Sequence, residues 1–180
     1  MALKSTIYKA DLQIADMDRH YYQDHSLTIA RHPSETDERL MIRLLAFVRH
    51  ASASLAFAKG LSDVDEPDLW QKDLTGAIDL WIDVGQPDER RMLKACGRAH
   101  QVIVYSYSST SAIWWGQIGS RVERARNLAV YNIASTTSAA LEAMARRSMQ
   151  LQCTVQDGQI WIGNGEQPLQ VDFTVLKAPS

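Results

Sequence analysis

The sequence is poor in the residues that cross-link small proteins or anchor proteins in membranes. Its 180 residues include only two cysteines, Cys96 and Cys153, which lie far apart and outside any Cys-x-x-Cys motif. We therefore expect two buried thiols in a reducing cytoplasm rather than a disulfide or a metal site. No apolar run approaches the roughly 18 residues of a membrane-spanning helix, and residues 1–15 lack the apolar core and cleavage site of a signal peptide. The sequence thus predicts a cytoplasmic protein that does not contact a membrane.

The motifs of several enzyme classes are also missing. The chain has no G-x-G-x-x-G, no phosphate-binding loop and no G-x-S-x-G motif, and its five histidines show no metal-binding spacing. The net charge of -2 argues against a strong attraction of the whole chain to nucleic acid, but leaves room for a local basic patch. What is present, 46% hydrophobic and 22% charged residues, is typical of one soluble domain, which we expect to span residues 1–180.

Hydrophobic periodicity predicts an α/β (α+β) fold. The two ends of the chain read as hairpins, with turns near Asp16–Arg19 and at Asp157-Gly158. Between them, a helix capped by Ser34 with Asp37 at its third position opens an alternation of helices and strands. The expected strands cover residues 54–60, 78–84, 101–107 and 127–133, and the expected helices cover 32–52, 87–99, 111–126 and 137–149. We therefore predict a mixed sheet flanked by helices, with a hairpin added at each end of the chain.

The strand over residues 78–84 places two carboxylates on one face. Asp79 and Asp83 alternate with apolar residues, but four residues of strand separate their α-carbons by about 13 Å, too far for both to bind one ion. A further acid must come from another element. If the chain folds back with a turn near Thr75, Asp68 comes roughly opposite Ile82, and Glu66 roughly opposite Val84. The other source is the first helix, where Glu35 and Glu38 share a face.

Such a cluster of oxygen ligands suits Mg²⁺ or Mn²⁺. The ion would polarise a phosphoryl oxygen and lower the pKa of bound water, and Lys94 on the following helix would stabilise developing negative charge. Each residue also has a simpler structural explanation. Glu35 and Glu38 lie in a first helical turn, Asp68 and Asp83 lie next to turns, and Asp79 and Lys94 suit solvent-facing positions.

Several segments together resemble the YaeQ family of bacterial proteins. The resemblance spans nearly the whole chain and is carried by "MALKSTIYKA", "LTIARHPSETDER", "GLSDVDEPDLW", "IDLWIDVGQPDERRMLKA", "IWW" and "QDGQIWI". It implies a fold similar to the PD-(D/E)XK nuclease superfamily, a mixed sheet flanked by helices. The activity implied by that likeness is cleavage of nucleic acid.

The superfamily pattern has an acid on one strand, an acid-x-lysine on the next and often a glutamate on the preceding helix. The second part falls on Asp83-Val84-Gly85, with glycine in place of lysine, and Lys94 would supply the missing ammonium group. The first acid is Asp68, in a literal Pro-Asp pair, or Asp79, in a Gly-x-x-Asp context.

The helical glutamate would be Glu38 or Glu35. Two hypotheses follow from the resemblance. The first is a Mg²⁺-dependent phosphodiesterase acting on nucleic acid. The second is a non-catalytic regulatory or interaction protein that keeps a degenerate nuclease-like fold.

Overall fold

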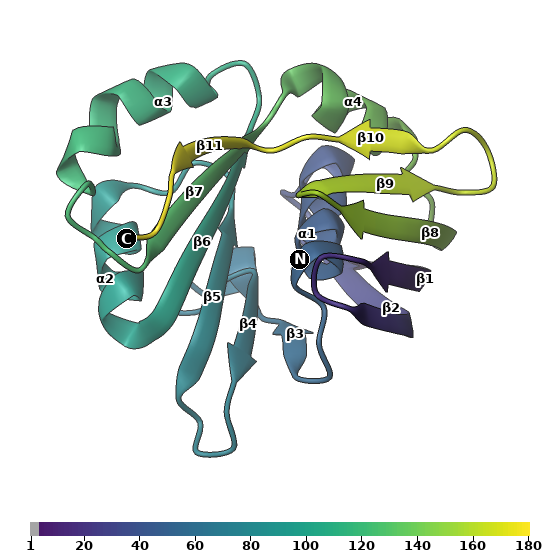
Figure 1. Ribbon diagram of the computed structural model, residues 1–180, viewed down its shortest axis with the longest axis horizontal. Helices are drawn as coiled ribbons and strands as arrows, with labels where there is room; N and C mark the ends of the chain where they lie inside the picture. The colour runs from purple at the N-terminus through teal and green to yellow at the C-terminus, as the bar shows by residue number, and fades with distance from the viewer. Residues whose placement is uncertain (1–3) are drawn as a thin grey trace. The chain divides into compact units, whose positions relative to one another are not determined.

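The computed structural model describes residues 4–180 and divides the chain into two compact units. Unit 1 comprises Met1–Arg49 and Thr136–Phe173, and unit 2 comprises His50–Ser135 and Thr174–Ser180. Each unit contains a mixed sheet with helices packed on it (Figure 1). The chain thus forms two mixed sheets flanked by helices, where the sequence had predicted one sheet, and a single domain over 1–180 stays a prediction.

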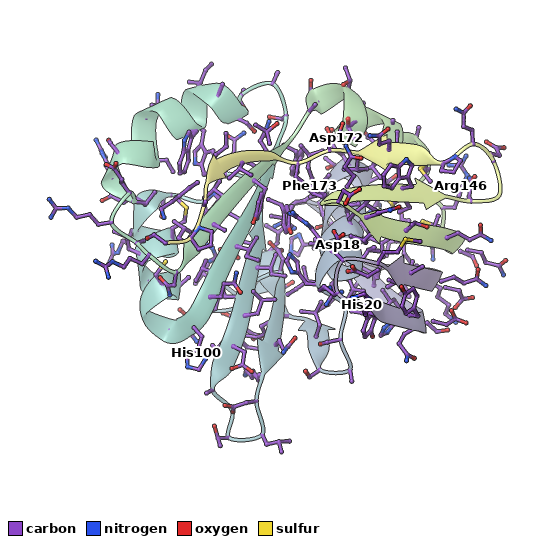
Figure 2. All side chains as sticks on the ribbon, in the orientation of Figure 1. Asp18, His20, His100, Arg146, Asp172 and Phe173 are labelled. Atoms are coloured by element: carbon purple, nitrogen blue, oxygen red, sulfur yellow. The ribbon has the colours of Figure 1, made fainter. Side chains whose placement is uncertain are left out.

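The sheet of unit 1 is built from the two ends of the chain. Its order is β10-β9-β8-β1-β2, in which β1 and β8 are parallel and the other pairs antiparallel. Both predicted hairpins, β1–β2 and β8–β9, are confirmed. Asp18, in the first turn, accepts hydrogen bonds from the backbone N–H groups of Asp157 and Gly158 in the second (2.8 and 2.9 Å), which lowers the pKa of Asp18 (Figure 2). The strands are β1 (Thr6–Asp16), β2 (Tyr21–Arg31), β8 (Ser148–Gln156), β9 (Gln159–Gly163) and β10 (Leu169–Val171).

Strict alternation along these strands separates a packed face from an open face. In β1, Tyr8, Ala10 and Leu12 are buried, whereas Lys9 and the other intervening residues to Gln13 are exposed. Helix α1 (Asp37–His50) covers the packed face. Helix α4 (Ser135–Ala143) contacts α1 through the hydrogen bond that Ser138 Oγ donates to Glu38. The opposite face of the sheet carries mostly polar side chains.

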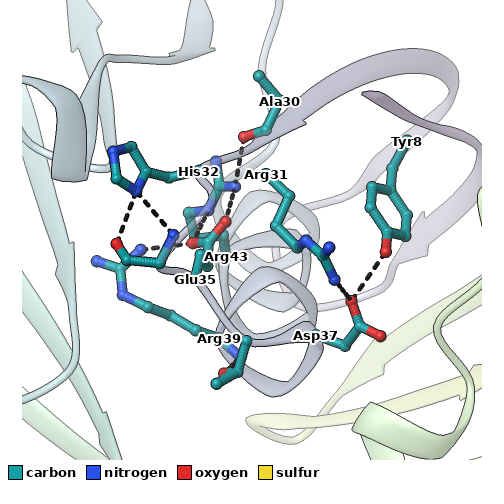
Figure 3. A network of polar contacts seen from close by, with 10 residues as sticks. Tyr8, Ala30, Arg31, His32, Glu35, Asp37, Arg39 and Arg43 are labelled. Carbon is teal, nitrogen blue, oxygen red and sulfur yellow. Dashed lines mark hydrogen bonds and ion pairs between the residues drawn. The ribbon is translucent and has the colours of Figure 1, made fainter. Parts of the chain in front are cut away.

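Helix α1 begins later than predicted. The predicted cap, Ser34, instead bonds the ring of His32, and the hydroxyl of Thr36 accepts from the backbone N–H of Arg39 (3.1 Å). Glu35 therefore precedes the helix, where it lies buried and accepts from both Arg39 (2.6 Å) and Arg43 (2.6 and 2.9 Å), as Figure 3 shows. A carboxylate withdrawn from water needs such partners.

Unit 2 holds a second mixed sheet of order β11-β7-β6-β5-β4-β3. Strands β5, β6 and β7 run parallel and were predicted as buried strands, while the remaining pairs are antiparallel. The elements are β3 (Leu55–Phe57), a 3₁₀ turn (Gly60–Ser62), β4 (Leu69–Lys72), β5 (Ile78–Val84), α2 (Glu89–Arg98), β6 (Ala99–Tyr107), α3 (Ser111–Ile118), a second 3₁₀ turn (Gly119–Arg121), β7 (Leu128–Ile133) and β11 (Thr174–Lys177).

Helices α2 and α3 pack on one face of this sheet. Trp81 of β5, Val104 of β6 and Val130 of β7 form a core with Met92 of α2, against which Trp114 of α3 lies. Residues on the other face of β5, such as Ile82, are buried as well. Strands buried on both faces are typical of parallel sheets covered by crossover helices.

The helices predicted over residues 111–126 and 137–149 extend beyond the C-terminal ends of the observed helices α3 and α4. The chain leaves α3 for a 3₁₀ turn at Gly119, and α4 ends at Ala143. Residues 168–176 split into β10 and β11, which join different sheets. Within residues 4–180, no helix has the length and apolar character required to cross a membrane.

We expect Glu35→Ala to destabilise the protein strongly, because it leaves the buried Arg43 guanidinium without its carboxylate. Breaking one partner of a buried pair costs about 3–5 kcal/mol. Urea denaturation measures the loss, with Glu123→Ala, an exposed acid, as the matched control. An equal effect of the two substitutions would contradict a stabilising role for Glu35.

Candidate functional site

Asp83, near the end of β5, is one of the predicted site acids that the structure buries. Its side chain is only 4% exposed, and both of its oxygens accept hydrogen bonds from the guanidinium group of Arg91, from Nε at 2.9 Å and from Nη2 at 3.0 Å. Two parallel bonds of this kind fix the orientation of both groups and are stronger than neutral hydrogen bonds. Asp83 is therefore held by a cation that belongs to the protein itself.

Asp68 lies beside Asp83, one residue away from its predicted register. The prediction placed Asp68 opposite Ile82, but Leu69 occupies that position and the N–H of Asp68 donates to the Ile82 carbonyl (3.0 Å). The cause is an irregularity in the β4–β5 ladder, where Gln71 pairs with Leu80 and Lys72 with Ile78. Asp79 is the extra residue of this bulge, which shifts the rest of the register by one.

The carboxylate of Asp68 is also buried and fixed by the backbone. Its Oδ2 accepts from the N–H of Val84 at 2.8 Å. Gly60, with φ of +50°, passes so close that a Cβ there would lie 2.6 Å from Oδ1 of Asp68. Only glycine combines this backbone conformation with this approach, so the local chain is fitted tightly around the acid.

Burial and a neighbouring acid both shift the pKa of Asp83. Burial raises the pKa of the Asp83 carboxyl above its ordinary value of 3.8, and the nearby Asp68 raises it further, while Arg91 lowers it. Burial is the largest of these effects. An acid perturbed in this way is found at functional sites and in structural ion-pair networks alike.

Arg91 does more than neutralise Asp83. Its Nη1 and Nη2 donate to the backbone carbonyls of Val64 (2.7 Å) and Glu66 (3.0 Å) in the acidic loop that precedes β4. We call Asp83, Arg91 and these two carbonyls the arginine clasp. It ties together strand β5, helix α2 and the loop over residues 63–66.

Two more cations of α2 hold the same loop. Lys94, predicted to assist catalysis, lies 3.1 Å from Asp65 in an exposed ion pair, and Arg98 donates to the Asp65 carbonyl at 2.7 Å. Residues three and four apart share a helix face, so Arg91, Lys94 and Arg98 form one basic row facing an acidic loop. In this structure, three basic side chains of α2 thus contact the loop over residues 63–66.

The start of α2 determines where this row points. Asp88 caps the helix by accepting from the backbone N–H of Arg91 at 2.8 Å. Arg91 is therefore the third helical residue after the cap, in the turn nearest to the end of β5. The role of Arg91 was not predicted, because the superfamily pattern calls for a lysine at this site. The available signal was the spacing of an acid, a turn and a capped helix.

Asp79 does not join the pair. In the bulge of β5 its Oδ1 contacts Nδ1 of His100 at 3.2 Å, in a largely exposed pair; Figure 2 labels His100. Glu38 and Glu35 belong to unit 1, where Glu38 accepts from the hydroxyl of Ser138 (2.9 Å) and Glu35 binds Arg39 and Arg43. The structure therefore brings together Asp68 and Asp83 among the predicted acids of unit 2.

The donor set does not fit Mg²⁺ as it stands. Both oxygens of Asp83 face a guanidinium group, and one oxygen of Asp68 faces a backbone N–H. A Mg²⁺ ion requires near-octahedral oxygen ligands, including carboxylates that are open to it. Across residues 4–180, no three His, Cys, Asp or Glu side chains are grouped so that they could bind a metal ion.

Comparison with known proteins agrees with the resemblance found in the sequence. A family model described as YaeQ protein matches residues 1–173. The chain is 47% identical over 181 residues to "Uncharacterized protein YaeQ" of Escherichia coli (strain K12), covering 100% of both proteins. The corresponding protein of Salmonella typhi is 46% identical over the same length and coverage.

Two solved structures share the fold. The crystal structure of the YaeQ protein from Xanthomonas axonopodis pv. citri has a TM-score of 0.93 at 46% identity, over 97% of this chain and 99% of that chain. The YaeQ protein from Pseudomonas syringae gives a TM-score of 0.93 at 33% identity, over 97% of each chain. Since sequence and structure agree over almost the full length, this chain belongs to the YaeQ family.

Proposed function

We propose that this chain is a non-catalytic interaction protein whose nuclease-like acids have become part of a structural clasp. The observation that carries the proposal is the paired bonding of Arg91 to both oxygens of Asp83. A catalytic carboxylate must present an oxygen to a metal ion, a water molecule or a substrate proton. In the clasp each oxygen of Asp83 already accepts a bond from the guanidinium group, which places a positive charge where a metal ion would have to bind.

The other bonds of Arg91 support the same conclusion. Arg91 also donates to the carbonyls of Val64 and Glu66, so moving it away from Asp83 would break bonds to the loop as well. Its loss would leave a buried carboxylate unpaired, a state that proteins avoid. The clasp thus supports a role in holding the fold together rather than in bond cleavage.

A second candidate function is a Mg²⁺- or Mn²⁺-dependent phosphodiesterase acting on nucleic acid, in a PD-(D/E)XK-like core. The observation that favours it is the closeness of Asp68, which directly precedes β4, to Asp83 of β5, together with the raised pKa of Asp83. Paired acids with shifted protonation are common at catalytic sites. In this candidate Arg91 must leave Asp83 before the acid can act.

We expect Arg91→Met to lower the free energy of unfolding by about 3–5 kcal/mol at neutral pH, because it leaves Asp83 buried and unpaired. Losing Arg91 raises the pKa of Asp83 further, so the deficit relative to wild type is largest when Asp83 is ionised and shrinks as the pH falls and the acid is protonated. Urea denaturation of both proteins from mildly alkaline to mildly acidic pH measures this gap.

The matched control is Arg90→Met, which changes an exposed arginine next to Arg91 on the same helix. It should leave stability within about 0.5 kcal/mol of wild type at every pH. The double variant Asp83→Asn, Arg91→Met should show no such pH dependence. A gap between Arg91→Met and wild type that stays constant with pH would contradict the clasp.

The two candidate functions differ in their response to metal. If the clasp is structural, neither Mg²⁺ nor Mn²⁺ should raise the melting temperature of the wild type, and no metal-dependent cleavage of single-stranded, duplex or branched DNA should occur. Binding to the folded state alone must raise the melting temperature. A metal-induced rise that disappears in Asp83→Asn but persists in Asp63→Asn, a partly buried acid of the loop that Arg91 contacts, would replace the first proposal with the second.

A further inference from the structure

Strand β2 forms the outer edge of the unit 1 sheet, next to β1 and to no other strand of the order β10-β9-β8-β1-β2 (Figure 1). It pairs with β1 along its whole length, from Tyr21 to Arg31, without any register shift. Natural edge strands are commonly protected by proline, by lysine, by a bulge or by being short. Strand β2 has no proline, lysine or bulge, and its eleven residues make it long.

Two hydrogen bonds show which backbone groups of β2 point away from β1. The N–H of Lys9 donates to Arg147, on the β8 side of β1, so the opposite residue Thr28 cannot be bonded to β1. The carbonyl of Ala30 accepts from the Arg43 side chain, which places it on the outer side as well. Alternation then points the N–H and C=O groups of Tyr22, Asp24, Ser26 and Thr28 outward.

These outward groups form a short docking edge with a defined end. Among residues 4–180, no hydrogen-bond partner is found for the outward backbone groups of Tyr22, Asp24, Ser26 and Thr28. The carbonyl of Ala30 already accepts a hydrogen bond from the Arg43 guanidinium group. An added strand would therefore pair only with the residues of β2 that precede Ala30. We refer to the segment from Tyr22 to Thr28 as the open edge.

The hollow beside one end of the open edge is lined by uncharged residues and the acid Asp24, whereas the exposed Lys9 of β1 lies opposite Thr28 at the other end. A shallow hollow of about 610 Å³ on the open face is lined by Tyr22 and Asp24 of β2 and by Gln13, Ala15, Gln152 and Thr154 of its neighbours. The side chain of Asp24 has no partner among the described residues. Gln13 of β1 lies opposite Asp24, and a second acid, Asp11, lies two residues before Gln13 on the same strand. A strand added here would place every second side chain over this face. A basic side chain in one of these positions would lie beside Asp24.

A second copy of this chain fits the open edge less well. An antiparallel copy centred on Ser26 would set Asp24 opposite Thr28 and supply no cation for it. Shifting the centre to Asp24 would put two acids opposite each other, which is destabilising.

We propose that the open edge binds an extended peptide segment of another protein by strand addition, with a lysine or arginine side chain placed beside Asp24. Backbone hydrogen bonds to Asp24, Ser26 and Thr28 would give affinity, and the hollow with its acid would give specificity. The proposal deepens the interaction role proposed above and rests on it, but it uses no residue of the arginine clasp.

The test uses the full-length protein and fluorescein-labelled peptides of alternating threonine and valine. The first peptide carries a central lysine, and the second carries a glutamine at that position. The third carries the central lysine but has N-methyl groups on the backbone of every second residue. Fluorescence anisotropy should show binding of the first, weaker binding of the second and none of the third. Amide exchange measured by NMR should show new protection at the N–H groups of Asp24, Ser26 and Thr28.

Variants of the protein locate the site. Ser26→Pro removes one outward N–H at an edge position where proline is tolerated, and should weaken binding of the lysine peptide at least about tenfold, close to the loss of one good bond. Ser26→Ala, which keeps the N–H, should bind like wild type. Asp24→Asn should weaken the lysine peptide about threefold and leave the glutamine peptide unchanged.

Three results would overturn the proposal. The first is that neither unmethylated peptide binds. The second is that Ser26→Pro binds the lysine peptide as tightly as wild type does, or that wild type binds the methylated peptide as tightly as the unmethylated one. The third is a concentration-dependent dimer that Ser26→Pro abolishes, which would assign the edge to a second copy. Because the methylated peptide leaves the protein unchanged, the test stands even if Ser26→Pro folds poorly. Metal-dependent cleavage would refute the proposed function but not peptide binding at the edge, so the two failures are distinguishable.

Discussion

The ion pair between Asp83 and Arg91 is the constraint on which the arrangement around β5 depends. A carboxylate buried to this extent is tolerated only with a cation and hydrogen bonds, and Arg91 supplies both. Arg91 can reach Asp83 because it lies in the first turn of α2. The position of that turn is fixed by the Asp88 cap, where the helix begins. The remaining donors of the same guanidinium then hold the acidic loop before β4.

Periodicity in the sequence was sufficient for most elements because one-sided burial leaves a clear pattern. The alternation of β1 and the Asp157-Gly158 turn predicted both hairpins correctly. The start of α1 was wrong because Ser34 and Thr36 are both good capping residues, and only contacts with His32 decide between them. The division into two sheets was not predictable, since strand pairing between distant segments leaves no local trace.

The candidate site shows the same limit. Asp68 and Asp83 could be paired from the sequence because the turn between β4 and β5 is short, yet the bulge at Asp79 moved the register by one residue. Lys94 and Arg91 are three residues apart on one basic face, so composition alone could not tell which of them reaches Asp83. That choice depends on the helix cap, a detail of a single hydrogen bond.

Under the proposed function, the buried ion pair gives a physical reason for Asp83 to persist without catalysis. Replacing Asp83 alone leaves the guanidinium of Arg91 without its acid, and replacing Arg91 alone leaves a buried carboxylate, so either single change is costly. A chain that had exchanged a metal ion for an arginine would therefore keep the acid through later sequence change, because both partners must be altered together. Under the proposed function, Asp83 is therefore kept because of its pairing with Arg91.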